Sequence, residues 1–144
     1  MKDHEEPYAR PTFWLNRASR LLTSEFERAL RGLDFGIAYL PVAKAIETQG
    51  PLTQASLKEI VGVEQPTMAN LLVRMERDGL IERSVNPSNR KETLVSLSAK
   101  GVDLLPEARS RVADIINRAL SGLDEHEQGA LGRLASHICE NLRK

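Results

Sequence analysis

The sequence is poor in aromatic residues and in cysteine, and its charges of opposite sign cancel. Aromatic residues make up 4% of the 144 residues, so we expect an aliphatic core, which favours the packing of helix on helix. The single cysteine, Cys139, has no partner for an internal disulfide, and this favours a reducing, intracellular compartment. With 20 basic and 20 acidic residues, binding to nucleic acid requires a basic face that is balanced by acidic residues elsewhere.

Long apolar runs are also missing. No stretch approaches the roughly 20 apolar residues that a membrane-spanning helix needs, and residues 1–10 lack the apolar run of a signal peptide, so we read them as a loose arm. We therefore expect a cytoplasmic protein. The length fits one domain over residues 1–144.

The motifs of common enzymes are absent as well. The sequence contains no phosphate-binding loop, no dinucleotide-binding glycine pattern and no nucleophile elbow, and no titratable pair is placed for acid–base work. His137-x-Cys139 is weak evidence for a metal site. We expect no enzyme activity, no metal and no cofactor. We interpret Cys139 as a buried structural thiol and not as an oxidation sensor, because no basic residue before Arg143 lies near it.

Periodic apolar residues and capping residues predict six helices. The first spans 11–31, the second carries 40–46, the third follows the cap Thr53 and buries Leu57, Ile60 and Val61, and the fourth spans 65–78. The fifth follows the cap Ser98, and the last spans 123–144 and starts with the capping-box pattern of Asp124 and Glu127. Between the fourth and fifth helices, residues 80–85 and 92–97 are rich in strand-forming residues and flank the polar loop 86–91. They predict a β-hairpin, with Arg90 and Lys91 at its tip.

This order of elements is a helix-turn-helix followed by a two-stranded wing. The fold class is therefore mainly α with a small β-hairpin (α+β). The stripes of the terminal helices, 11–31 and 102–144, exceed what so small a domain needs for its own core, and such stripes commonly pack on another subunit. We expect a homodimer.

The fourth helix has one apolar face and one polar face. Met68, Leu71, Leu72 and Met75 share the apolar face. Amide side chains can pair with adenine, arginine can pair with guanine, and threonine can contact the methyl group of thymine. Taken alone, the polar face of this helix is explained equally well as a solvated surface. The hairpin with a basic tip that follows the helix favours binding to DNA. The candidate DNA-binding residues are Gln65, Thr67, Asn70, Arg74, Arg90 and Lys91.

The segment VEQPTMANLLVRMERDGLIERSVNPSNRKETLVSLSAKG, residues 63–101, resembles the recognition helix and wing of MarR-family transcriptional regulators. LTQASLKEIVGV, residues 52–63, is similar to the preceding helix and turn. The resemblance implies one MarR-like domain, with a winged helix-turn-helix over 36–101 and dimerisation helices over 11–31 and 102–144. Asn89 stands where the family usually has aspartate, so we expect Arg90 to be less firmly oriented.

The resemblance also implies the function. It implies a homodimer that binds a pseudo-palindromic operator on double-stranded DNA, usually as a repressor, and that is released by a small molecule or a stress signal. The alternative is a winged-helix module for protein–protein assembly without an operator, which should expose large apolar residues on the fourth helix and the wing. Aromatic residues of the first two helices could line an effector pocket, but packing in the dimer core explains most of them better; they are Phe13, Trp14, Phe26, Phe35 and Tyr39.

Overall fold

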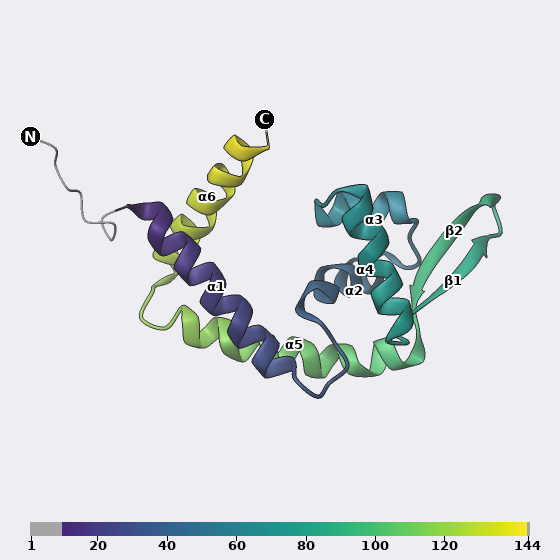
Figure 1. The fold of residues 1–144 in the computed structure, drawn as a ribbon, viewed down its shortest axis with the longest axis horizontal. Helices are drawn as coiled ribbons and strands as arrows, with labels where there is room; N and C mark the ends of the chain where they lie inside the picture. The colour runs from purple at the N-terminus through teal and green to yellow at the C-terminus, as the bar shows by residue number, and fades with distance from the viewer. Residues whose placement is uncertain (1–9, 144) are drawn as a thin grey trace, which may run out of the picture.

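The computed structural model describes residues 10–143, so the arm expected over residues 1–10 lies almost wholly outside the described residues. The elements are α1 (Pro11–Leu30), the short 3₁₀ helix η2 (Ile37–Tyr39), α2 (Leu40–Gln49), α3 (Gln54–Val61), α4 (Gln65–Arg77), β1 (Ile81–Asn86), β2 (Asn89–Leu97), α5 (Ala99–Ala119) and α6 (Glu125–Leu142). Figure 1 shows a lobe of α2, α3, α4 and the hairpin at one end, and α1 and α6 at the other. The long helix α5 runs along both parts. The expected mainly α fold with one small hairpin is confirmed.

The hydrophobic core lies inside the winged lobe. Its fully buried side chains include Val42 of α2, Leu57 of α3 and Met75 of α4. Leu105, Ala108 and Val112 of α5 close the same core from below, so α5 is both a wall of the lobe and its link to α1. The predicted apolar face of α4 is confirmed, because Met68, Leu71, Leu72 and Met75 are all buried.

Local side-chain hydrogen bonds fix where the helices begin. Thr53 Oγ1 accepts a hydrogen bond from the backbone N–H of Ser56, and Ser98 Oγ accepts one from Gly101. Asp124 and Glu127 form both hydrogen bonds of a capping box at the start of α6. These caps agree with the sequence predictions, because caps depend on residues only two or three positions away.

The wing is tighter than predicted. β1 and β2 pair antiparallel from Ile81↔Leu97 to Asn86↔Asn89, so β2 begins at 89 and not at 92. Asn86 Oδ1 accepts from the backbone N–H of Ser88 at 3.0 Å, and Asn89 Oδ1 accepts from that of Lys91 at 3.2 Å. These local bonds close a short turn at 87–88. Arg90 and Lys91 therefore lie at the start of a strand beside the tip and not in a loop.

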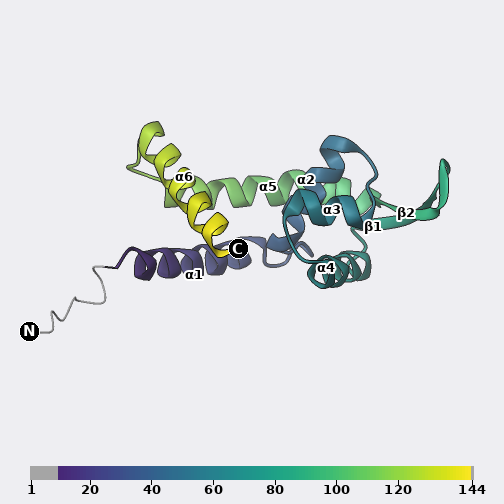
Figure 2. The ribbon, with the colours of Figure 1, turned by 90° about the horizontal axis from the view of Figure 1, so that it is seen from above.

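The base of the wing is fastened to the lobe. Leu52 and Val95 exchange two backbone hydrogen bonds, of 3.0 and 2.7 Å, in an isolated bridge. Val95 is buried, whereas the outer residues of both strands are exposed. The hairpin thus projects from an anchored base, as Figures 1 and 2 show.

The terminal helices leave their apolar stripe uncovered. Arg118 of α5 pairs with Glu25 of α1, and Arg111 donates to the carbonyl oxygen of Ala29 at 3.1 Å, so α1 is tied to α5. By contrast, α6 contributes no buried residue, and Leu134 on its stripe is 55% exposed. Cys139 is exposed in the single chain, so the expectation of a buried thiol is wrong here, because packing within residues 10–143 fully buries no residue of α6.

Candidate nucleic-acid interface

The helix α4 lies at the outer edge of the lobe (Figure 2). Its buried residues share one face, so the opposite face is exposed. The six candidate residues are all exposed: Gln65, Thr67, Asn70, Arg74, Arg90 and Lys91. Positions 67, 70 and 74 are spaced by three and four residues, so they follow one line along the helix surface. Gln65 lies in the first turn of α4, about half a turn around the helix from that line. The apolar side chains of α4 are buried in the core, and this packing fixes which way the polar face of the helix points.

A second line of residues runs beside the first. Asn70, Val73 and Arg77 follow the same spacing and occupy the middle of the exposed face. Val73 is 62% exposed, which is unusual for an aliphatic side chain on a helix with an otherwise polar face. The candidate set omitted Val73 and Arg77, although helical periodicity alone would have placed them there.

Ion pairs divide the basic side chains of this region into two groups. Arg77 Nε lies 3.1 Å from Asp78 Oδ1, and Arg83 Nε lies 2.7 Å from Glu76 Oε2. Lys100 Nζ lies 3.5 Å from Asp34 Oδ2 and also donates to the backbone oxygen of Asp78 at 2.8 Å. These three cations are partly neutralised by protein groups, and the bond from Arg83 to Glu76 also ties β1 to α4.

The other group consists of Arg74, Arg90 and Lys91. Within residues 10–143, none of these three side chains has a hydrogen bond or an ion pair with a protein group. Their charges are therefore available to an anion. The local bond that Asn89 makes is to the backbone of Lys91, so its amide leaves the guanidinium of Arg90 untouched. The same three cations are the basic members of the DNA-binding set predicted from the sequence.

A buried tyrosine anchors the C-terminal end of α4. Tyr39 is 2% exposed, and its hydroxyl donates to Asp78 Oδ2 at 2.7 Å. Burial raises the pKa of Tyr39, and the hydrogen bond to Asp78 raises it further. The hydrogen bond from Arg77, followed by that from Tyr39, lowers the pKa of Asp78. No sequence signal links Tyr39 to α4, because the contact joins residues that are 39 positions apart.

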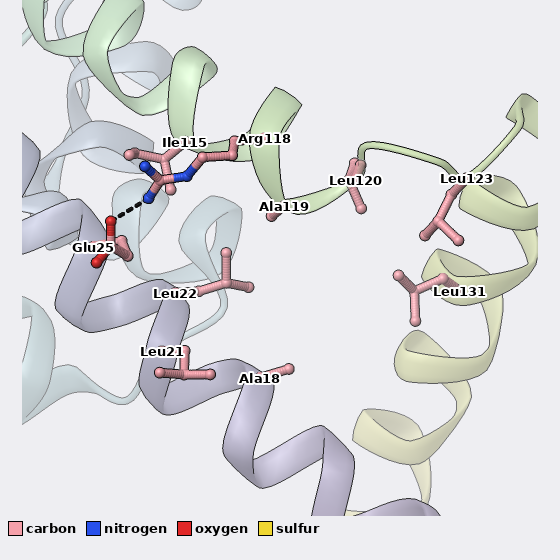
Figure 3. Close-up of a pocket in the computed structure, with 10 residues that line it drawn as sticks. All are labelled: Ala18, Leu21, Leu22, Glu25, Ile115, Arg118, Ala119, Leu120, Leu123 and Leu131. Atoms are coloured by element: carbon pink, nitrogen blue, oxygen red, sulfur yellow. Dashed lines mark hydrogen bonds and ion pairs between the residues drawn. The ribbon is translucent and has the colours of Figure 1, made fainter.

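An apolar cleft lies at the other end of the molecule (Figure 3). Leucines of α1 and α6, such as Leu22 and Leu131, face it, and its volume is about 380 Å³. The ion pair between Glu25 and Arg118 lies at its margin. The other lining residues are apolar, so the cleft suits apolar packing.

Across positions 10–143, no three His, Cys, Asp or Glu side chains gather in a way that could hold a metal ion. None of the helices in that range is both long and apolar enough to cross a bilayer.

Comparisons with known proteins agree with this geometry. Residues 44–93 match the model of the MarR family. The chain is 22% identical over 132 residues to the HTH-type transcriptional repressor IacR of Pseudomonas putida, covering 92% of this chain and 79% of that protein.

Solved structures show the same fold. BpsR of Bordetella bronchiseptica, whose DNA binding is regulated by 6-hydroxynicotinic acid, superposes with a TM-score of 0.80 at 22% identity, over 90% of this chain and 93% of that one. A mutant MarR from E. coli in complex with operator DNA superposes with a TM-score of 0.78 at 21% identity, over 88% and 91% of the two chains. The overall fold of this chain is thus shared with these proteins.

Proposed function

We propose that the chain is a MarR-family transcriptional regulator that binds a specific sequence of double-stranded DNA, as a repressor, because residues 44–93 match the model of that family and the chain is similar to a transcriptional repressor. One observation carries the proposal. The exposed face of α4 is mainly polar, and Arg74, Arg90 and Lys91, whose side chains have no hydrogen bond or ion pair to a protein group within residues 10–143, lie on that helix and on the adjoining wing.

In this proposal the recognition helix α4 enters the major groove. Asn70 and Gln65 offer donor and acceptor pairs that match adenine, and Thr67 can contact a thymine methyl group. The wing reaches the adjacent minor groove, where the negative potential attracts Arg90, and Lys91 contacts a phosphate.

The proposed active form is a homodimer. The cleft between α1, α5 and α6 and the exposed leucines of α6 would then be covered by the second copy, which buries apolar surface that one chain leaves in water. Two recognition helices related by a two-fold axis read half-sites about 34 Å apart, so the operator is a pseudo-palindrome. A protein with this task and one free thiol is expected in the cytoplasm.

A small-molecule effector completes the proposal. A second cleft, of about 600 Å³, lies between α2 and α5 and is lined by apolar residues such as Val112 and Ile116 and by Lys44, Glu47 and Arg109. Arg109 is paired with Glu47, so Lys44 is the cation of this lining that is left for a small anionic ring compound. The DNA binding of the relative BpsR is regulated by 6-hydroxynicotinic acid. A ligand that prefers the form with misplaced recognition helices would draw the dimer off its operator by population shift.

The alternative is a protein-assembly module. It requires large apolar residues on the exposed face of α4 and on the wing. Val73 and Val85 are the large apolar side chains exposed there among the described residues, and they lie on different elements. The observed surface therefore favours DNA over a protein partner.

Selection from a random pool of duplex DNA tests the proposal. The full chain is mixed with the pool at two salt concentrations, binding is followed by fluorescence anisotropy, and the bound fraction is sequenced. Enrichment of a pseudo-palindrome with half-sites about one helical turn apart would support a dimeric operator-binding protein. Binding without enrichment would replace it with a non-specific DNA-binding role, and an absence of binding at low salt would favour the protein-assembly module.

A further inference from the structure

Arg74 and Asp78 lie one turn apart on α4, and a single side chain from outside the helix contacts both. The guanidinium carbon of Arg74 lies 5.5 Å from the centroid of the Tyr39 ring, and the hydroxyl of Tyr39 donates to Asp78 Oδ2 at 2.7 Å. Tyr39 ends η2, in the connection between α1 and α2. Its ring is itself held edge-on by Phe35, with 5.8 Å between the ring centroids. The platform beneath Arg74 is thus a buried, fixed ring.

The neighbouring acid does not capture Arg74. An aspartate four residues after an arginine on a helix is within reach of an ion pair. Here both carboxylate oxygens of Asp78 are occupied, Oδ1 by Arg77 and Oδ2 by Tyr39. Consequently Arg74 keeps all its N–H donors free of protein acceptors within residues 10–143, although an acid lies one turn away.

We propose that Tyr39 is a positioning residue for Arg74, which it holds by cation–π stacking in the orientation that contacts DNA. This inference rests on the proposed function. Stacking restrains the plane of the guanidinium but leaves the donors at its edge free for guanine or phosphate. A restrained side chain loses less conformational entropy when it binds, and this increases affinity without a new contact.

A positioning role and a purely structural role of Tyr39 lead to different expectations for DNA binding. If the ring only fills space, the charge distribution on its face has no effect on DNA binding. If the ring orients a cation, affinity depends on the negative potential of that face, which electron-withdrawing fluorine atoms reduce with little change of shape.

The test is a fluorination series at position 39. Tyr39→Phe is compared with phenylalanines that carry increasing numbers of ring fluorines, introduced at the same position of the full chain. Affinity is measured for the duplex most enriched from the random pool. Tyr39→Phe is the reference of the series, because it lacks the hydroxyl that donates to Asp78 Oδ2, as every fluorinated phenylalanine does. We expect the most fluorinated ring to bind about tenfold more weakly than Tyr39→Phe.

Arg74→Ala provides the matched background. In this background the fluorination series should be flat, because the cation that senses the ring is gone. Arg74→Lys should bind nearly as weakly as Arg74→Ala, because an ammonium group keeps the charge but has no plane to orient. Unfolding midpoints of all the variants are measured in parallel.

Three outcomes would overturn the inference. The first is equal affinity across the fluorinated rings while the native protein binds its selected duplex. The second is a fluorine dependence that persists in Arg74→Ala, which would assign the effect to folding. The third is a native protein that selects no duplex at low salt, which would refute the proposed function together with this inference.

Discussion

The backbone of Gly101, in the first turn of α5, lies against the carbonyl group of Leu80, at the entry to the wing. A Cβ atom at position 101 would lie 2.3 Å from the oxygen of Leu80, closer than any real contact. The same carbonyl accepts a hydrogen bond from the backbone N–H of Ser98 at 2.9 Å, and Ser98 Oγ donates to the carbonyl oxygen of Gly79 at 2.6 Å. The turn after α4 and the start of α5 are therefore joined backbone to backbone. Such a close backbone contact restricts how α5 can be oriented relative to α4.

Gly101→Ala should destabilise the protein strongly. The clash is with backbone and not with a flexible side chain, so the turn or α5 must move, and we expect a loss of at least about 1–3 kcal/mol in the free energy of unfolding. The measurement is chemical denaturation followed by circular dichroism. Gly129→Ala is the control, since a Cβ there meets nothing within 4 Å and alanine raises helix propensity by up to about 1 kcal/mol. Equal unfolding midpoints for the native protein and Gly101→Ala would show that the backbones of Gly101 and Leu80 are not in close contact.

These contacts show what could be predicted from the sequence. Helix starts at Thr53, Ser98 and Asp124 depend on neighbours in the chain, so local rules found them. Gly101 belonged to the motif that carried the family resemblance, but its reason is a contact with Leu80, 21 positions away.

The errors also have physical causes. The predicted start of β2, at 92, was too late, because asparagine is typical of loops. In the structure the side chains of Asn86 and Asn89 close the turn, and the strand begins at 89. Ile60 was expected to face the core but is 46% exposed, since α3 is only eight residues long and buries Leu57 instead. The contact of Tyr39 with α4 has no periodic signal at all.

Tyr39 should titrate above its ordinary pKa of about 10. Burial is the main cause, and the hydrogen bond to Asp78 adds to it. Because the folded protein holds this proton more tightly than the unfolded chain, the stabilisation is complete below pH ~10 and is lost as the pH rises through the higher folded-state pKa.

Ultraviolet absorbance of tyrosinate checks this in a Tyr8→Phe background, which leaves Tyr39 as the one phenol. Asp78→Asn should move the pKa of Tyr39 towards its ordinary value without reaching it, because burial remains. An unshifted titration in a protein that stays folded by circular dichroism would contradict the hydrogen bond.

Asn70→Ala should weaken binding to the selected duplex by about 1–3 kcal/mol and relax the preference at one base pair of each half-site. Asn70 lies where the two exposed lines of α4 meet, so its amide has the most central position on that face. Affinities for single-base variants of the duplex measure the effect. A uniform loss over all duplexes would instead identify Asn70 as a phosphate contact.

Leu134→Asp should convert a dimer into a monomer. Leu134 is 55% exposed in the single chain and lies on the apolar stripe of α6, so a second copy would bury it and a carboxylate there would be desolvated without a partner. Ser136→Asp, on the opposite side of the same helix, introduces the same charge and should leave the dimer intact. Light scattering gives the molar mass of each variant. A dimeric Leu134→Asp would exclude this face of α6 from the interface.

Arg90→Ala and Lys91→Ala should weaken binding to every DNA sequence alike and reduce its dependence on salt. Neither side chain has a partner within residues 10–143, so no ion pair is broken when it is removed, and stability should hardly change. Each phosphate contact that is lost should lower the slope of log affinity against log salt by roughly 0.9. A contact with base edges in the minor groove would instead cost affinity mainly at particular positions of the site.

Arg133→Ala is the matched control for the wing. This variant removes the same charge from an exposed position on α6, away from α4 and the hairpin. It therefore measures the effect of lowering the net charge of the protein by one. If Arg133→Ala lowers the slope as much as Arg90→Ala does, the net charge of the protein governs the salt dependence and the wing has no special place on the DNA. A lowered slope for the two wing variants alone would place Arg90 and Lys91 against the phosphate backbone, since screening acts only on charges that are close to it.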